Sequence, residues 1–347
     1  MHSTFRVGVT PDFYEEVKGK FEEPVASKLG DLDWLEVHPM RPEPGNFISS
    51  SSLNEYDAVL ALAIKFTQES VAGVDRPAVI ARWGVGYDMV DVDALTANDI
   101  ALAITPGAVR RPVADAILAL IFALTANVVG QDRLVRAGKW RGDLPRLGRT
   151  PQGRTLGSLG CGNIAQELFR IARSIGFGRF VAHDPYVSPE VATTLGVELV
   201  GMEELFSQSD YLCVNTPLSA ATRGIVDAGL LRRMRPTAYL INTARGPIVN
   251  QAALTQALEE HWIAGAGLDV FETEPLPMDD ALRQLDNVIL APHGLAWTEE
   301  LARDNSLEAC ENILTIARGE IPAAIVNRDV LKRPGFQQKL DRYRRRV

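Results

Sequence analysis

Cysteine and histidine are scarce in this sequence. Its 347 residues include three Cys and five His, and aromatic residues make up 7%. The cysteines, Cys161, Cys213 and Cys310, are widely spaced, odd in number and form no CxxC pair, which argues against a disulfide framework and against a zinc site. We therefore expect no metal, and three small buried thiols in a reducing compartment.

Long apolar runs are also lacking. No stretch reaches the roughly 18 apolar residues that a membrane helix needs. The longest candidate, residues 113–129, contains Asp115 and Asn127 and is typical of a buried helix. The chain enters an expected strand at residue 5 without the apolar segment of a secretory signal. We expect a cytoplasmic protein with no membrane partner.

Positive charge is in deficit, with 36 Lys and Arg against 44 Asp and Glu and a formal net charge of −8. This balance argues against a general nucleic-acid surface, so we expect no nucleic-acid partner. Residues 332–347 are the exception, because they carry seven cations and only Asp341, a net charge of +6 that leaves −14 elsewhere. Such a basic tail is more often a solvated helix end or a subunit contact.

The chain is longer than one hydrophobic core usually supports, which predicts two domains. Short apolar strand patterns alternate with helical patterns in two series, which predicts two α/β lobes with parallel sheets. The expected strands are 5–9, 32–37, 58–64, 78–82 and 101–104, then 155–159, 179–183, 211–215, 238–242, 266–269 and 288–291. Two long helices, from Pro112 to about residue 138 and over 298–317, should connect the lobes.

A glycine-rich turn follows the expected strand 155–159. Gly160, Gly162 and Ala165 form a G-x-G-x-x-A motif that opens a helix over 164–175. The first Gly permits a tight turn, the second lets the backbone approach a pyrophosphate, and the small third residue lets helix and strand pack closely. The helix N-terminus then presents free N–H groups to phosphate.

An acidic residue stands where such a loop needs one. Asp184 ends the next strand, 22 residues after Gly162, where a carboxylate would bind the ribose 2′-OH. No Arg follows it directly to hold a 2′-phosphate, so the sequence favours NAD over NADP.

Seven motifs then occur in order along the chain, and with them it resembles the D-isomer-specific 2-hydroxyacid dehydrogenases over roughly residues 55–330. The motifs are GVGYD (84–88), TPG (105–107) with VAD (113–115), the Gly160 loop, NTPL (215–218) with TRG (222–224), NTARG (242–246), GLDVFETEP (267–275) and APH (291–293).

The resemblance implies a catalytic group of Arg245, Glu274 and His293. Hydride transfer at carbon 2 requires a proton to join or leave the attached oxygen, and imidazole ordinarily titrates near neutral pH. Glu274 would orient the imidazole, and the Arg245 guanidinium would hold the substrate carboxylate and polarise the carbonyl. Glu272 is a second candidate acid, but the family position is the residue just before Pro275.

The same resemblance implies contacts with cofactor and substrate. Asn163 and Ile164 should line the pyrophosphate, and Asp269 should contact the nicotinamide carboxamide. The residues expected to flank the cofactor are Thr216, Thr222, Thr243 and Ala244. In the other lobe, N–H groups of Val85 and Gly86 should bind the substrate carboxylate, with Lys65 and Phe66 completing that wall.

Three features depart from the common pattern, and the first is the pair Gly294-Leu295 directly after His293. Arg110 and Arg111 precede Pro112 at the expected helix N-terminus, where the dipole disfavours cations unless an anion binds nearby. We hypothesise that one of them contacts a substrate phosphate or sugar-acid hydroxyl, the alternative being solvated or ion-paired side chains. Trp297, four residues after His293, either walls the pocket or is a packed aromatic.

The lobes follow the family's division. Residues 1–105 with 297–330 would bind the substrate, residues 106–296 would bind NAD, and 331–347 would form the basic tail. A homodimer is expected, since the family's first long helix usually packs against its copy. The spacing of Ala116, Leu120, Ala123 and Leu124 fits that contact or an ordinary buried face equally well.

We therefore predict an NAD-dependent oxidoreductase that transfers a hydride between nicotinamide and C2 of a small D-2-hydroxy or 2-oxo acid. A phosphorylated or sugar-derived acid is one candidate substrate of this class. The formate dehydrogenases of the superfamily place Gln where Glu274 stands, which argues against formate. An NAD-sensing corepressor-like binding protein of the same fold stays open as an alternative.

Overall fold

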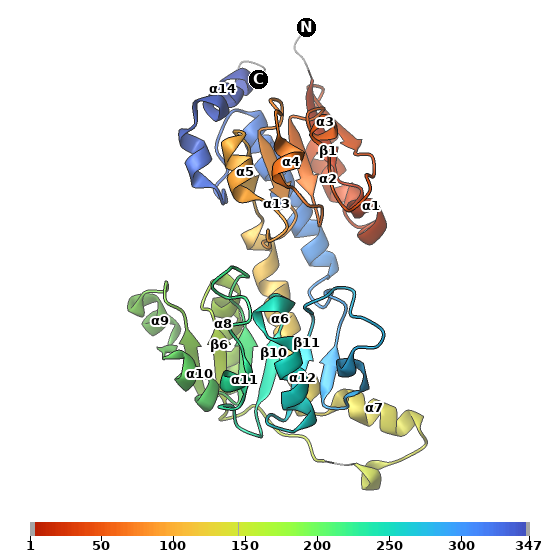
Figure 1. Ribbon diagram of the computed structural model, residues 1–347, viewed down its shortest axis with the longest axis vertical. Helices are drawn as coiled ribbons and strands as arrows, with labels where there is room; N and C mark the ends of the chain where they lie inside the picture. Colours follow the sequence, from red (N-terminus) through yellow and green to blue (C-terminus); the bar gives the residue numbers. More distant parts are fainter. Residues whose placement is uncertain (1–3, 145, 345–347) are drawn as a thin grey trace. The chain divides into compact units, whose positions relative to one another are not determined.

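The structure is a computed structural model that describes residues 4–144 and 146–344. It divides into two compact units: Met1–Val109 with Trp297–Val347 form unit 1, and Arg110–Ala296 form unit 2. Each unit contains one parallel sheet with helices packed on it, so the predicted fold class is confirmed. Figure 1 shows both sheets.

Unit 1 has a five-stranded sheet in the order β2-β1-β3-β4-β5, with every neighbouring pair parallel. Its elements are β1 (Phe5–Val9), α1 (Asp12–Glu16), α2 (Glu22–Leu29), β2 (Leu35–Pro39), α3 (Ser50–Leu53), β3 (Ala58–Ala61), α4 (Gln68–Val71), β4 (Val79–Arg82), α5 (Val92–Ala97), β5 (Ala101–Ala103), α13 (Glu299–Ala317), η4 (Arg328–Lys332) and α14 (Pro334–Arg344).

Helices cover both faces of this sheet. Alternate strand residues such as Val59 and Ile80 are fully buried and pack in one cluster with Leu53, Val71 and Leu95 of α3, α4 and α5. Helix α13 contacts β3, β4 and α2. Since successive strand residues point to opposite faces, a strand buried on both sides reads as a continuous apolar run, which is why these strands are recognisable in the sequence.

Unit 2 has a seven-stranded parallel sheet in the order β12-β11-β10-β9-β6-β7-β8. Its elements are α6 (Pro106–Thr125, which begins in unit 1), α7 (Val128–Arg136), η1 (Arg141–Asp143), β6 (Thr155–Leu159), α8 (Asn163–Ile175), β7 (Arg179–His183), α9 (Pro189–Leu195), β8 (Glu198–Leu199), α10 (Met202–Gln208), β9 (Tyr211–Val214), α11 (Ala228–Leu231), β10 (Tyr239–Asn242), η2 (Gly246–Ile248), α12 (Gln251–Glu259), β11 (Gly265–Leu268), η3 (Ala281–Gln284) and β12 (Val288–Leu290).

The strand order of unit 2 reverses between β6 and β9. Strands β6, β7 and β8 run outward on one side, and β9 to β12 run outward on the other. At such a switch point the loops at the carboxyl ends diverge and leave a crevice, which is where open α/β sheets bind ligands. Helices α6 and α8 pack on one face, through Ile117 and Phe169, and α11 and α12 pack on the other, through Leu231 and Leu254.

The long helix predicted from Pro112 to residue 138 was wrong at its start and in its continuity. Helix α6 begins six residues earlier, at Pro106, and contains Pro112 in its second turn. It ends at Thr125, and Asn127 adopts a left-handed conformation (φ 55°) before α7 begins. Asn tolerates that conformation better than most residues, so it breaks the helix without Gly or Pro. Arg110 and Arg111 therefore lie within the helix and not at its N-terminus.

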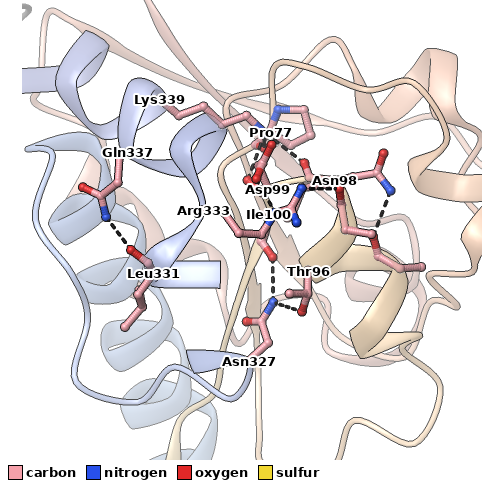
Figure 2. Close-up of polar contacts among 12 residues, drawn as sticks. Pro77, Thr96, Asn98, Asp99, Ile100, Asn327, Leu331, Arg333, Gln337 and Lys339 are labelled. Carbon is pink, nitrogen blue, oxygen red and sulfur yellow. Dashed lines mark hydrogen bonds and ion pairs between the residues drawn. The ribbon is translucent and has the colours of Figure 1, made fainter. Parts of the chain in front are cut away.

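The residues predicted as a separate basic tail belong to unit 1. Segment 326–344 crosses the end of that sheet, and Figure 2 shows its polar contacts. The Asn327 amide oxygen accepts the Leu102 N–H at 2.8 Å, and the Arg333 guanidinium pairs with Asp99 at 2.5 Å. Within α14, Phe336, Leu340 and Tyr343 are fully buried at helical spacing.

The tail was misread because its charge hides this apolar stripe, which recurs every three or four residues on one side of the helix. The cations Arg345 and Arg346 lie outside the described residues.

Over the described part of the chain, no single helix is long and apolar enough to cross a membrane. The pair α6 and α7, bent by 55°, meets the criterion by length and composition alone, and α6 lies in the core of unit 2.

Lys339 should make the stability of the protein rise with pH. Its ammonium is buried and donates to the carbonyls of Pro77 (2.8 Å), Asp99 (3.0 Å) and Asn98 (3.3 Å). Burial lowers the pKa of Lys339 to about 8. The unfolded chain therefore holds this proton more tightly than the folded one. Burial of the charged ammonium lowers the free energy of unfolding by its full amount below pH 8, and this loss disappears as the pH rises toward the ordinary pKa of Lys.

Between pH 7 and 9.5 the wild type should thus gain roughly 2 kcal/mol of unfolding free energy relative to Lys339→Met, measured by urea unfolding. Lys332→Met, at an exposed position of the same segment, should follow the wild type. Parallel pH profiles for wild type and Lys339→Met would contradict a buried charge at this position.

Candidate active site

The residues predicted to bind the cofactor follow successive strands of the unit 2 sheet. Because all strands of this sheet are parallel, these positions share its carboxyl edge. They are Gly160 and Gly162 after β6, Asp184 after β7, Thr216 after β9, Thr243 and Ala244 after β10, and Asp269 after β11.

The glycine loop has one crowded and one open position. Gly160 has φ 94°, and a Cβ there would lie 2.8 Å from the Asn215 carbonyl oxygen across the switch point. Gly162 caps α8 with ordinary backbone angles, and a Cβ there would meet no described atom within 4 Å. No side chain caps this helix within the described residues, so the first-turn N–H groups of Asn163 and Ile164 remain suited to a phosphate.

Asp184 is fixed against the glycine loop. Its Oδ2 accepts the Cys161 N–H at 2.7 Å, and its Oδ1 accepts the Tyr186 and Val187 N–H groups at 2.8 and 3.2 Å. Because backbone donors hold the Asp184 carboxylate at the end of β7, its orientation is fixed. A fixed orientation is what the predicted hydrogen bond to a ribose hydroxyl would require.

Two threonines at this edge differ in how their hydroxyls are used. Thr222 Oγ1 donates to the Pro217 carbonyl at 2.7 Å and accepts the Ser219 N–H at 2.8 Å, so it closes its own turn. Thr243 Oγ1, directly after β10, is buried and is the one such side-chain atom without a hydrogen-bond partner in residues 4–144 and 146–344. A buried polar group left unpaired by the chain calls for a ligand atom, so the site fits a dinucleotide.

Three of the loops at this edge meet around the Glu274 carboxylate. Its Oε2 lies 2.8 Å from His293 Nδ1, and its Oε1 accepts the Phe271 N–H at 2.9 Å. His293 has φ 54°, a conformation that side-chain-bearing residues rarely adopt. Glu272, the other acid considered, instead accepts the Gln251 N–H at 2.9 Å and faces α12.

Asp269 holds the loop that carries His293. Its carboxylate accepts the N–H groups of Gly294 (3.0 Å) and Leu295 (3.2 Å). In the structure Asp269 thus orients the segment that follows the histidine, whereas the sequence predicted a contact with the nicotinamide carboxamide, which stays a prediction. Burial raises the pKa of Asp269 despite these hydrogen bonds.

Glu274 shows the opposite balance. Burial alone would raise the pKa of Glu274, but the hydrogen bond from His293, the charge of His293, the Phe271 N–H and the Arg245 cation together lower it below its ordinary value. The acid is therefore ionised at neutral pH and accepts the hydrogen bond from the imidazole.

Arg245 lies in a loop that Asn242 organises. Asn242 is the last residue of β10 and is almost fully buried. Its Nδ2 donates to the Arg245 carbonyl at 3.0 Å, and its Oδ1 accepts the Ala244 N–H at 3.1 Å. Our sequence reasoning did not single out this residue for a role, although a polar side chain ending an apolar strand was a visible signal.

Gly246 lets the Arg245 loop approach the Glu274 loop. A Cβ at Gly246 would overlap the backbone carbonyl of Phe271, the residue whose N–H binds Glu274. Because the two loops lie close together, the positive charge of Arg245 lowers the pKa of Glu274. The glycine that ends the NTARG motif is thus required for backbone packing between two loops.

The predicted carboxylate-binding loop lies in unit 1, after β4. Arg82 Nε donates to the Gly86 carbonyl at 2.9 Å and so holds the loop. Within the described ranges neither the Val85 N–H nor the Gly86 N–H donates to another residue. Lys65 is exposed, whereas the Phe66 side chain is buried in the unit 1 core among apolar side chains; their predicted place in a binding wall stays a prediction.

The remaining predicted residues occupy different environments. Arg111 Nε binds the Asp115 carboxylate at 2.8 and 2.9 Å, and its Nη1 lies 3.8 Å from Glu167, so the ion-paired alternative holds for this residue. Trp297 is 39% exposed and packs its ring edge-on against Trp83, with centroids 6.2 Å apart.

Comparisons with known proteins show which family the chain resembles. A family model described as "D-isomer specific 2-hydroxyacid dehydrogenase, NAD binding domain" matches residues 118–294. A glyoxylate reductase of Korarchaeum cryptofilum is 38% identical over 96% of this chain and 99% of its own, and one of Thermococcus litoralis is 37% identical over 84% and 89%. A solved glyoxylate reductase from Paecilomyes thermophila superposes with a TM-score of 0.79 at 29% identity, covering 94% of this chain and 99% of that one.

Gly162→Ala should separate folding from cofactor binding. The added methyl group meets no described atom, so the thermal unfolding midpoint should stay at the wild-type value. The methyl would occupy the space that the pyrophosphate needs, so the dissociation constant of NADH, measured by fluorescence titration, should rise by about tenfold or more.

Gly201→Ala is the matched control, because Gly201 caps α10 in equally open surroundings. Unchanged NADH affinity in Gly162→Ala would contradict a dinucleotide at this loop.

Proposed function

Because the chain belongs to the D-isomer-specific 2-hydroxyacid dehydrogenase family, we propose that it reduces a small unphosphorylated 2-oxo acid, with glyoxylate as the first candidate. At the level of the family it is an NAD-dependent 2-hydroxyacid dehydrogenase. The observation that carries the proposal is the hydrogen bond between His293 Nδ1 and Glu274, beside a loop that holds Arg245.

His293 is the proposed acid and base. With Nδ1 bound to Glu274, Nε2 is the ring nitrogen left to give a proton to the substrate oxygen or take one from it. Glu274 is a positioning residue that acts through the imidazole. Bound NAD(H) would supply or accept the hydride at carbon 2.

Arg245 is the proposed anchor of the substrate. A guanidinium can bind a carboxylate with two parallel hydrogen bonds and can also polarise the neighbouring carbonyl. Within unit 1, we further propose that the Val85 and Gly86 N–H groups serve as donors to a carboxylate, since neither donates elsewhere among the described residues. Lys65 would add positive charge, and Trp297 would present an apolar surface.

Two observations favour a small acid over a phosphorylated one. The anion-binding hypothesis for Arg110 and Arg111 rested on a helix N-terminus that α6 does not have there, and Arg111 is already paired with acids. The relatives reported above are named as glyoxylate reductases. Because these names describe enzymes, they give no support to the NAD-sensing alternative.

Purified protein should oxidise NADH in the presence of glyoxylate, and more slowly with pyruvate, hydroxypyruvate and phosphorylated hydroxypyruvate, as followed by NADH absorbance. His293→Ala should lower kcat/KM by roughly 10²- to 10⁴-fold, because it removes the proton donor. Glu274→Gln should lower it by about 10²-fold, because an amide can present its N–H to the imidazole and favour the wrong tautomer.

Both variants should bind NADH with wild-type affinity, which separates a lost proton donor from a lost cofactor site. Full activity in His293→Ala would overturn the assignment, and a preference for the phosphorylated acid would overturn the proposed substrate.

We also propose a homodimer formed through the segment around α7. Unit 2 exposes a group of apolar side chains there, namely Phe122, Val128, Val135, Trp140 and Leu147. Exposed apolar side chains that gather on one segment can mark a protein interface, whereas Ala116, Leu120 and Leu124 of α6 are buried.

The double variant Val128→Asp with Val135→Asp should sediment as a monomer, because two buried charges would oppose association. Ile321→Asp, a matched exposed apolar position in unit 1, should leave the sedimentation coefficient unchanged. A monomeric wild type at micromolar concentration would contradict the proposal.

A further inference from the structure

Adjacent arginines on α6 have different surroundings. Arg111 is held by Asp115 and lies near Glu167. Arg110 is exposed, and within residues 4–144 and 146–344 it makes neither a hydrogen bond nor an ion pair. The surrounding acids account for the position of Arg111, but no acid among the described residues accounts for the position of Arg110 on the helix that packs against the glycine loop.

Helix α6 runs antiparallel to the strands of unit 2. At its C-terminal end, Thr125 Oγ1 donates to Tyr211 Oη at 2.9 Å, and Tyr211 is the first residue of β9. This end therefore lies at the amino edge of the sheet. The 15 residues back to Arg110 span about 22 Å, whereas a five-residue strand spans only about 17 Å. Arg110 consequently lies at or just beyond the carboxyl edge, on the side of the glycine loop.

The face of α6 that carries Arg110 is the face that packs on that loop. Ala114, Ile117 and Ile121 follow Arg110 at helical spacing, and all three are fully buried. They belong to one cluster with Cys161 and Ala165, which are residues of the G-x-G-x-x-A motif itself. Because helical side chains lean toward the N-terminus, the Arg110 side chain extends from this stripe past the edge of the sheet.

Glu167, in the second turn of α8, gives a second measure of the position. Its pKa is lowered by the hydrogen bond from Arg170, against burial, and also by the charges of Arg170, Arg111 and Arg110. Arg110 is thus within electrostatic reach of the helix whose N-terminus forms the loop. Arg170 binds Glu167 directly at 2.6 Å, so this acid already has a partner.

We propose that the Arg110 guanidinium binds the diphosphate of the NAD(H) cofactor, adding a mobile cation to the N–H groups of the α8 N-terminus. This assignment replaces the substrate contact that the sequence suggested for the arginine pair. Arg111 has a different task, because it links α6 to α8 through Glu167.

The test compares Arg110→Gln with Arg111→Gln by isothermal titration of NADH, ADP-ribose and adenosine into the full-length protein. Arg110→Gln should weaken NADH and ADP-ribose by roughly 5- to 20-fold, as expected for one charge-assisted hydrogen bond. Adenosine, which has no phosphate, should bind both variants and the wild type equally. Arg111→Gln should leave all three affinities within about twofold.

Arg110→Lys should recover part of the NADH affinity, because it keeps the charge but loses the two-pronged geometry. The wild type should lose more NADH affinity than Arg110→Gln between low and high salt, because one ionic contact is missing in the variant. Equal NADH affinity in wild type and Arg110→Gln would overturn the proposal. Equal losses in Arg110→Gln and Arg111→Gln would also overturn it, because they would indicate only a general surface charge.

Discussion

The Glu274 carboxylate is the point on which the arrangement of the site depends. One oxygen binds the Phe271 N–H of its own loop and the other binds His293 Nδ1, so a single side chain connects the loops after β11 and β12. The Arg245 loop after β10 approaches the same place, because Gly246 has no Cβ to collide with the Phe271 carbonyl. Removing the carboxylate would leave the imidazole, in its uncommon left-handed backbone, without its orienting partner.

Backbone packing at the carboxyl edge of unit 2 explains why glycines recur there. Gly160 and Gly246 are needed because another stretch of backbone lies where a Cβ would project. Gly162 is different, because the space beside it is open in the chain alone. Gly160 and Gly246 therefore serve the fold, whereas the ligand role proposed for Gly162 has no competing packing role, a distinction that the G-x-G spacing by itself does not reveal.

Strand β8 of unit 2 was missed, because its two residues, Glu198 and Leu199, form no apolar run, whereas the other strands of this unit were predictable as short apolar runs bounded by turn residues; the predicted ranges 155–159 and 179–183 match β6 and β7 residue for residue. The start of α6 was not predictable, because Pro112 looks like a first helical residue and only tertiary packing carries the helix through it.

The choice of Glu274 over Glu272 came from the family resemblance, since both acids precede the same proline in a loop without periodicity. The docking of α14 was missed because its net charge outweighed its apolar stripe.

The charges around His293 also determine which of its ring nitrogens is available for the proposed proton transfer. Because the pKa of Glu274 is held below its ordinary value, the acid is an acceptor at neutral pH, and Nδ1 must carry a hydrogen to satisfy it. Nε2 is then an acceptor in the neutral ring and a donor in the charged one, so the same atom would serve both directions of the proposed proton transfer. Burial raises the pKa of Asp269, and this residue contributes through its hydrogen bonds to the loop that carries His293. It is Glu274 that accepts the hydrogen bond from Nδ1 and so selects the tautomer of the ring. The two acids thus divide the work: one fixes the backbone that carries the histidine, and the other fixes its proton.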